Sequence, residues 1–113
     1  MDGFSVSKPS SSSAVVTFPK EVIGGPEAME LSHIIRECIA EGRTVIVLDL
    51  EDVSIMNSSG LGMLVSSLTT VRKQGAKLCL AAIPEKVTSL LAMTQLSQIF
   101  DVYPTVSEAV GKS

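Results

Sequence analysis

The sequence contains few aromatic residues: no tryptophan, one tyrosine and three phenylalanines in 113 residues. Because 45% of the residues are nevertheless hydrophobic, a buried core has to consist of valine, isoleucine, leucine, methionine and alanine. A chain of this length and hydrophobicity can bury such a core without disulfides or a structural metal. Aliphatic cores favour helices packed on a sheet, and the length predicts one domain that covers residues 1–113.

The sequence also lacks basic clusters and long apolar runs. Nine Lys and Arg residues are scattered among twelve Asp and Glu residues, with a formal net charge of −3. Nucleic acid is therefore not an expected partner, because phosphate backbones are bound by clustered Lys and Arg. No window approaches the ~20 apolar residues of a membrane span, so we expect no membrane insertion. The first residues do not resemble a secretory leader, and we expect a cytoplasmic protein.

Cysteine and histidine are scarce, which limits the chemistry of any site. Cys38 and Cys79 lie in apolar runs without the CxxC or Cys/His spacing of a zinc site, so we expect two buried free thiols. His33, the only histidine, lies among acidic and apolar residues of a predicted helix, where we expect a surface position. Asp49 and Asp52 stand near a strand end without a further ligand cluster, so we predict no metal site.

Motifs of hydrolases and nucleotide-binding proteins are absent. The Gly-x-Ser-x-Gly turn of a hydrolase nucleophile would need glycine where Met56 and Asn57 stand. The P-loop pattern does not occur, and Val65 occupies the position of the third glycine in a dinucleotide fingerprint. We therefore expect no enzymatic activity and no cofactor.

Hydrophobic periodicity divides the chain into alternating strands and helices. Two β-rich runs flank a serine-rich turn, which predicts a hairpin or two neighbouring strands. The glycines and prolines of segment 19–26 predict a loop. The predicted strands are 4–8, 14–18, 44–50, 76–83 and 99–103, and the predicted helices are about 31–41, 59–73, one from Pro84 and one from Thr105, where Thr105 and Glu108 form a capping box.

The order of these elements predicts the fold. Repeated strand–helix–strand units form right-handed crossovers between parallel strands. The nearly continuous apolar run 44–50 is typical of a central strand that is covered on both faces. We therefore predict an α/β fold with a mixed, mostly parallel sheet of four to five strands, about four helices and an antiparallel edge formed by the first strands.

The segment "NSSGLG", residues 57–62, lies between the predicted central strand and the next helix. Ligands and modified groups of open α/β sheets gather at this edge. Capping explains part of the segment: Asn57 or Ser58 can cap the helix, and the two glycines can let it approach the sheet closely. A glycine inside a helix costs roughly 0.5–1 kcal/mol relative to alanine, so we expect a role beyond capping.

A serine at the amino end of a helix is well placed to carry a phosphate. Free N–H groups and the helix dipole stabilise the added charge of about −1.5 to −2. Helical spacing puts Gly62, Met63, Ser66 and Thr70 on the same side as Ser59, apart from the apolar stripe. This side is small and mostly uncharged, which suits protein docking, and a dianion at its edge would disturb docking.

The segment around these residues resembles a known family. "VLDLEDVSIMNSSGLGMLVSSL" is similar to the signature of the STAS domain, and most closely to that of bacterial anti-sigma factor antagonists. The family's usual form is a hydrophobic strand, then Asp-Ser-Ser/Thr-Gly-Leu-Gly, then a helix. A weaker similarity continues on both sides and covers roughly residues 4 to 111. The resemblance implies a single STAS-like domain with the fold predicted above.

The resemblance also implies a binding switch that is not an enzyme. Members of this family bind an anti-sigma factor that is also a serine kinase of the histidine-kinase-like ATPase type, and so free a sigma factor. The kinase phosphorylates the serine before Gly-Leu-Gly, which ends binding, and a serine phosphatase restores the first state. The modified residue would be Ser59, with Ser58 as second choice, and ATP and Mg²⁺ would belong to the partner.

The resemblance further implies which residues contact the partner. Small residues and one methionine at the start of the helix would form the contact surface, with an apolar centre that supplies much of the binding energy. That centre is expected at Leu61 and Met63. The implied partner-binding residues are Asn57, Ser58, Gly60, Leu61, Gly62, Met63 and Ser66.

Two departures from the family pattern remove carboxylates. Asn57 replaces the family's Asp, and the loop after the second strand lacks the Gly-x-x-Asp often found there. Asn caps a helix about as well as Asp, and the loss of a like charge favours a phosphate on Ser59. Two alternatives stay open. One is an unphosphorylated, constitutive STAS scaffold or accessory subunit in a stress-signalling or lipid-transport complex, and the other is a domain that binds a small ligand or nucleotide or acts as an enzyme.

Overall fold

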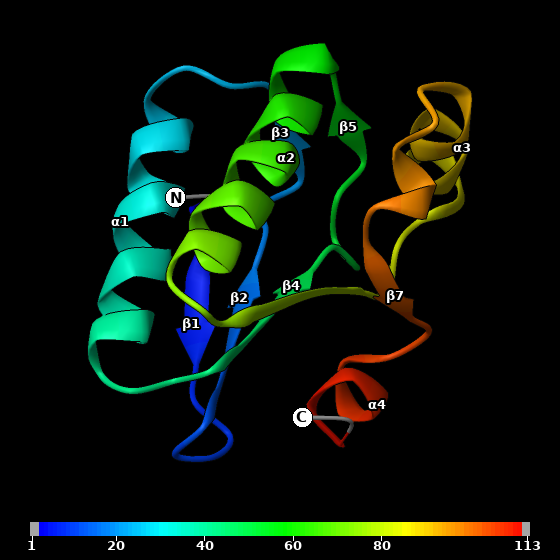
Figure 1. Ribbon diagram of the computed structural model, residues 1–113. Coiled ribbons are helices and arrows are strands. Elements are labelled where there is room, and N and C mark those ends of the chain that lie inside the picture. The colour runs from blue at the N-terminus through cyan, green and yellow to red at the C-terminus, as the bar shows by residue number, and fades with distance from the viewer. Residues whose placement is uncertain (1–2, 112–113) are drawn as a thin grey trace.

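The main sheet of the computed structural model, which describes residues 3–111, has five strands (Figure 1). Their order is β1-β2-β4-β6-β7. β1 pairs antiparallel with β2, and the other neighbours pair in parallel, which confirms the predicted mixed sheet with an antiparallel edge. The bounds are β1 Ser5–Ser7, β2 Ser13–Thr17, β4 Val45–Asp49, β6 Lys77–Ala81 and β7 Asp101–Tyr103.

The central strand β4 is covered on both faces, as its continuous apolar run predicts. Ile46 and Leu48 belong to one buried cluster and Val45 and Val47 to another, which is the alternation expected of a strand. Helices α1, α2 and α3 contribute to the first cluster, and α4 contributes Ala109 to the second. The helical elements are α1 Pro26–Ala40, α2 Ser58–Lys73, α3 Glu85–Met93, the 3₁₀ turn η1 Leu96–Gln98 and α4 Val106–Gly111.

The sequence predicts a loop at 19–26, and this prediction is wrong in part. Glu21–Val22 forms a short strand, β3, which pairs in parallel with β5, Ile55–Met56, in a second sheet apart from the main one. Two-residue strands carry no readable periodicity, so only tertiary contacts define them. Helix α1 also begins earlier than the expected residue 31, because Pro26 occupies its first turn after Gly25.

Several smaller predictions are confirmed. The Cys38 and Cys79 thiols are free and buried, and burial raises the pKa of each. His33 has an exposed side chain that lies 3.5 Å from a Glu37 carboxylate oxygen. The N–H of Glu108 donates to Thr105 Oγ1 at 3.1 Å, as the predicted cap requires.

A separate observation concerns helix length and composition. Between residues 3 and 111, no helix has the length and apolar character needed to cross a membrane.

Candidate functional site

Helix α2 begins with the cap that the sequence predicts. Asn57 is the N-cap residue with extended backbone angles, φ −106° and ψ −174°. Its Oδ1 accepts a hydrogen bond from the N–H of Gly60 at 2.8 Å. One of the unpaired donors at the helix start is satisfied in this way.

The side chain of Asn57 also makes a second hydrogen bond that sequence reasoning missed. Its Nδ2 donates to the carbonyl oxygen of Ile23 at 3.2 Å. Asn57 therefore ties the start of α2 to the segment that follows β3. An aspartate has no donor for this bond, so the departure from the family pattern has a structural counterpart.

Ser58 and Ser59 occupy the first turn of α2, and both are exposed. The first N–H groups of a helix have no carbonyl partner within it, and neither of these two N–H groups has an acceptor among residues 3–111. No acidic residue lies in this turn. A phosphate here would meet free donors and the positive end of the helix dipole.

The two glycines of the segment play different parts. A Cβ added at Gly60 would lie 2.1 Å from the Val22 carbonyl oxygen, so α2 touches β3 backbone at this point. A Cβ at Gly62 would meet no atom within 4 Å. The expectation of close approach is therefore confirmed for Gly60, although the contact is with the small sheet, and it is wrong for Gly62.

Gly24 lies directly against Ser59. A Cβ on Gly24 would come within 2.7 Å of Ser59 Cβ, and the φ of Gly24 is +94°, a conformation that other residues adopt at a cost. The segment between β3 and α1 thus forms one wall beside the candidate phosphorylation site. The adjacent glycine pair in the sequence is the signal that could have predicted this approach.

The expected apolar centre of the docking surface is not exposed. Leu61 and Met63 are each only 5% exposed and belong to the main core. Leu61 and Leu64 belong to the buried stripe of α2, as helical spacing predicts. Met63 lies on the neighbouring side of α2, and α1 packs against that side and buries it. Leu61 and Met63 therefore support the site from below. Gly62 and Ser66 remain exposed.

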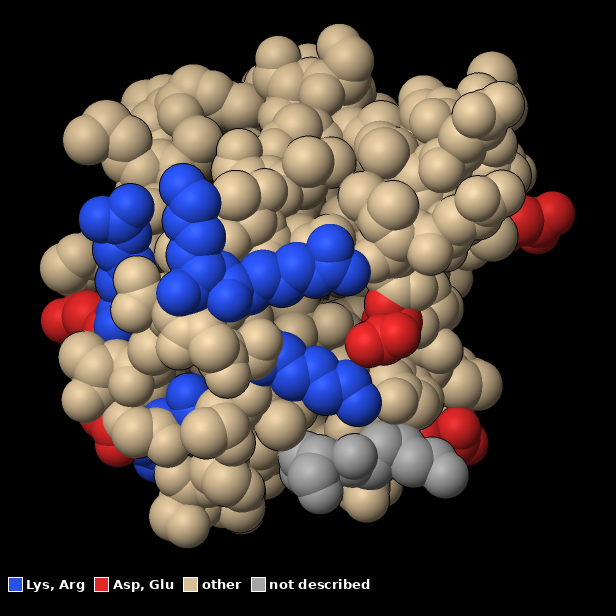
Figure 2. Space-filling model, viewed as in Figure 1, with Lys and Arg blue, Asp and Glu red and all other residues tan. Residues whose placement is uncertain are grey.

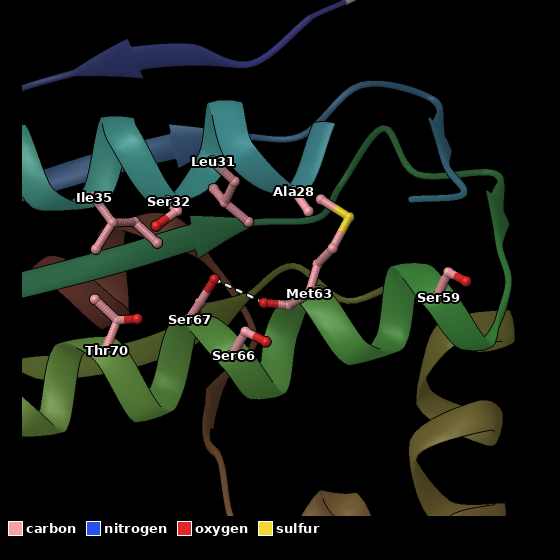
Figure 3. A pocket seen from close by; sticks show the side chains of 9 residues that line it. All are labelled: Ala28, Leu31, Ser32, Ile35, Ser59, Met63, Ser66, Ser67 and Thr70. Carbon is pink, nitrogen blue, oxygen red and sulfur yellow. Dashed lines mark hydrogen bonds between the residues drawn. The ribbon is translucent and has the colours of Figure 1, made fainter. Parts of the chain in front are cut away.

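A groove runs between α1 and α2, and Ser59 lies at one end of it (Figure 3). Its volume is about 170 Å³. The Met63 side chain points toward α1, and the buried Ser67 hydroxyl is satisfied by donating to the Met63 carbonyl at 2.8 Å (Figure 3). The lining residues are Ala28, Leu31, Ser32, Ile35, Ser59, Met63, Ser66, Ser67 and Thr70.

Charge is distributed unevenly over the face that carries this groove. Figure 2 shows no coloured charges over the upper part of this face, where α2 begins, whereas Lys and Arg gather across its middle. The last turn of α2 is basic, with Arg72 and Lys73. An approaching partner would therefore meet an uncharged surface beside Ser59 and positive potential further along the helices.

The Asp49 carboxylate at the end of β4 has structural partners. Asp49 accepts hydrogen bonds from the Glu51 N–H at 3.1 Å and from Thr17 Oγ1 at 3.3 Å. Among residues 3–111, no group of three or more His, Cys, Asp or Glu side chains is arranged to hold a metal ion. The candidate site is thus a surface of hydroxyls, glycines and apolar groups.

Comparisons with known proteins agree with this description. A model of the STAS domain matches residues 9–109. The chain is 35% identical over 74 residues to a Thermotoga maritima protein provisionally named an anti-sigma factor antagonist, and the match covers 66% of either chain. It is 38% identical over 64 residues to the anti-sigma-B factor antagonist of Bacillus subtilis, covering 57% of this chain and 59% of that one. The matches thus span just under two thirds of these relatives.

The fold is shared with a solved relative from Bacillus. The structure of the cell fate determinant SpoIIAA in its phosphorylated form has a TM-score of 0.74 at 18% identity, covering 97% of this chain and 98% of that one. This likeness concerns the fold, which agrees with the strand order described above. Since the STAS model matches from the turn before β2 into α4, the chain belongs to the STAS domain family.

Proposed function

We propose that this protein is an anti-sigma factor antagonist that binds an anti-sigma factor and so frees a sigma factor. The names of its relatives in Thermotoga and Bacillus support this role. The uncharged surface at the start of α2 is suited to protein docking. The partner is an anti-sigma factor with serine kinase activity, which brings its own ATP and Mg²⁺.

The switch in this proposal is phosphorylation of Ser59. The observation that carries it is the place of Ser59: exposed, in the first turn of α2, and at one end of the groove between α1 and α2. Ser58 is also exposed but does not line the groove, so it is the second choice. A kinase can reach Ser59 without unfolding the helix.

The phosphate acts on the partner and leaves the fold in place. It adds a charge of about −1.5 to −2 beside a surface that carries no acidic residue in that turn. The N–H groups at the helix start stabilise this charge where it stands. Docking then requires burial of a dianion, which is costly without a matching cation. A serine phosphatase restores the neutral surface.

The deciding experiment measures binding with matched charge variants. The parent chain, Ser59→Asp, Ser58→Asp and Ser89→Asp are used as baits in native cell extract, and the retained kinase is then titrated against each purified chain. Ser89 is an exposed serine on α3, so its variant carries the same added charge away from the site. We expect the kinase to bind the parent and Ser89→Asp and to be lost with Ser59→Asp.

Two other results would contradict the proposal. If the Ser59→Asp and parent chains bind the same proteins with equal affinity, the chain is a constitutive scaffold. If only Ser58→Asp loses the kinase, the switch lies at Ser58. Incubation of the parent and of Ser59→Ala with the kinase and ATP, followed by peptide mass spectrometry, tests the modified residue directly.

A further inference from the structure

The groove beside Ser59 widens on its solvent side into a larger, shallower hollow. This hollow has a volume of about 460 Å³ and shares Ala28, Ser32 and Ser66 with the deeper part. Its outer wall is α1, where Met29 is 79% exposed. The remaining lining residues are His33 and Arg36. The two parts form one depression with an apolar floor and a broad mouth, which we call the α1–α2 groove.

The floor of this groove fits one apolar side chain. Leu31, Ile35 and Met63 line the deep part, and its buried hydroxyl, Ser67, already donates to the Met63 carbonyl. A cavity of roughly 150 Å³ with apolar walls holds a benzene molecule, so about 170 Å³ admits a leucine, methionine or phenylalanine side chain. An exposed methionine at the mouth adds a surface that adapts to different side chains.

The charged side chain that lines the groove directly is basic. Arg36 lines its mouth, and helical spacing places Lys73 on the stripe of α2 that also carries Ser59, Ser66 and Thr70. Neither Arg36 nor Lys73 forms an ion pair with a carboxylate of residues 3–111. No Asp or Glu lines either part of the groove.

Two carboxylates of α1, Glu37 and Glu41, line a separate hollow toward β1. The Glu37 carboxylate also lies 3.5 Å from His33 at the edge of the mouth, so its charge is paired there. Figure 2 shows Lys and Arg across the middle of this face, with acidic atoms beside the right-hand end of this basic band and further Asp and Glu at the margins. The chain is negative as a whole, so positive potential on this face is a local feature that selects its ligand.

We propose that the α1–α2 groove docks an acidic segment of a protein partner, which inserts one apolar side chain between the helices. The apolar floor takes the anchor, and Arg36 and Lys73 attract the carboxylates that flank it. Nucleic acid does not fit, because it offers no aliphatic anchor and needs more clustered cations. Such docking lies beside the Ser59 switch but does not depend on it.

One consequence rests on the proposed function. A phosphate on Ser59 at the end of the groove repels an acidic segment, because like charges at short range in a partly desolvated site are unfavourable. Modification and docking are then mutually exclusive. Phosphorylation of Ser59 would then weaken partner binding in two ways: at the start of α2 and in the α1–α2 groove.

The test uses synthetic peptides and the full-length chain. Three amphipathic helical peptides are compared: one with leucines on one face and glutamates elsewhere, one with lysine in place of every glutamate, and one with alanine in place of every leucine. Each is titrated into the ¹⁵N-labelled protein. We expect the first peptide alone to shift the amide signals of Ala28, Ser32, Met63 and Ser66, and to bind less tightly as salt is added.

Matched charge reversals complete the test. The double variant Arg36→Glu/Lys73→Glu is compared with Lys20→Glu/Lys86→Glu, which changes the net charge equally at exposed positions away from the groove. Arg36→Glu/Lys73→Glu should bind the acidic peptide more weakly than the parent, by up to about tenfold. Lys20→Glu/Lys86→Glu should bind it with the affinity of the parent. Dispersed amide spectra verify that both variants fold.

Four results would overturn the inference. Three of them are equal shifts with the lysine peptide, shifts confined to other surfaces, and unchanged affinity of Arg36→Glu/Lys73→Glu. The fourth is a loss of the same signals with rising protein concentration alone, which would identify a second copy of this chain as the occupant. Because no kinase is present in these titrations, their outcome is independent of whether Ser59→Asp loses the anti-sigma factor.

Discussion

The side-chain amide of Asn57 donates to the carbonyl oxygen of Ile23 across 3.2 Å, while the oxygen of the same amide accepts from Gly60. One side chain therefore holds two segments that are far apart in the sequence. This pair of bonds joins the start of α2 to the segment after β3.

Substitutions at Asn57 should separate its two roles. Asn57→Ser retains a capping hydroxyl but is too short to reach Ile23, so we expect a loss of about 0.5–1.5 kcal/mol in the free energy of unfolding. Asn57→Ala loses both bonds and should cost about 1–2 kcal/mol or more. Urea denaturation gives both values, and amide exchange at Asn57, or at the residue that replaces it, should quicken in each variant, because this N–H donates to the Val22 carbonyl across the same junction. Equal stability of the two variants would show that the bond to Ile23 contributes nothing.

Gly60 and Gly62 should respond in opposite ways to alanine. Gly60→Ala places a Cβ 2.1 Å from the Val22 carbonyl oxygen, so α2 and β3 must separate, and we expect a loss of about 1–3 kcal/mol or more. Gly62→Ala meets no atom within 4 Å and removes a flexible residue from a helix, so it should gain about 0.5–1 kcal/mol. Denaturant midpoints of the two variants on the same side of the parent would contradict this reading.

Sequence periodicity was sufficient for the main sheet and for α2, α3 and α4. Each of these elements is long enough, or has a cap such as Thr105 with Glu108, to show its period or its boundary locally. Periodicity failed for β3 and β5, whose two residues each have no period to read. They exist because Val22 and Met56 pair with each other and lie against Gly60.

The candidate site was predicted in part. Asn57, Ser58 and Ser59 stand where the sequence places them, at the start of α2. Met63 was assigned to the exposed surface because a helical stripe considers one buried face only. In the structure α2 packs against both the sheet and α1, and this second neighbour buries Met63. The sequence of α2 alone does not indicate that α1 packs against it.

Gly24→Ala tests whether the wall beside Ser59 matters for binding. Both Gly24 and Gly25 have positive φ, at +94° and +76°, so alanine is strained at either position and should cost roughly 1–3 kcal/mol. Only at Gly24 would the new methyl also displace Ser59, since a Cβ at Gly25 meets nothing within 4 Å. At temperatures where both variants are folded, Gly24→Ala should bind the proposed anti-sigma factor partner more weakly than Gly25→Ala. Equal affinities would remove Gly24 from the docking surface.

Two methionines on neighbouring helices provide a test of burial. Met63→Ala removes a side chain that is 5% exposed and should cost about 2–5 kcal/mol, toward the lower end because Met63 borders the groove. Met29→Ala removes a side chain that is 79% exposed and should change the free energy of unfolding by no more than about 0.5 kcal/mol. Thermal denaturation compares the two. A small effect of Met63→Ala would mean that α1 does not pack on it.

The buried thiols predict a loss of stability in alkaline solution. Burial raises the pKa of Cys38 and Cys79 above the ordinary value of 9.0, so the folded state holds these protons more tightly than the unfolded state. The stability that the two protonated thiols contribute is fully present while the pH is below their pKa in the unfolded chain. It is lost as the pH rises through their pKa in the folded chain. Urea midpoints between neutral pH and pH well above 9.0 should therefore fall more steeply for the parent than for Cys38→Ala/Cys79→Ala. Parallel profiles would assign the alkaline loss to other groups.

The small β3–β5 sheet stands apart from the five-stranded sheet, and it carries the segments that frame Ser59. A region with few strands and few buried side chains opens locally at a lower free energy than the main core does. Changes in its residues therefore place little burden on the cooperative unfolding of the whole domain. Surfaces of this kind can diverge between relatives and acquire new partners while the scaffold beneath them stays the same.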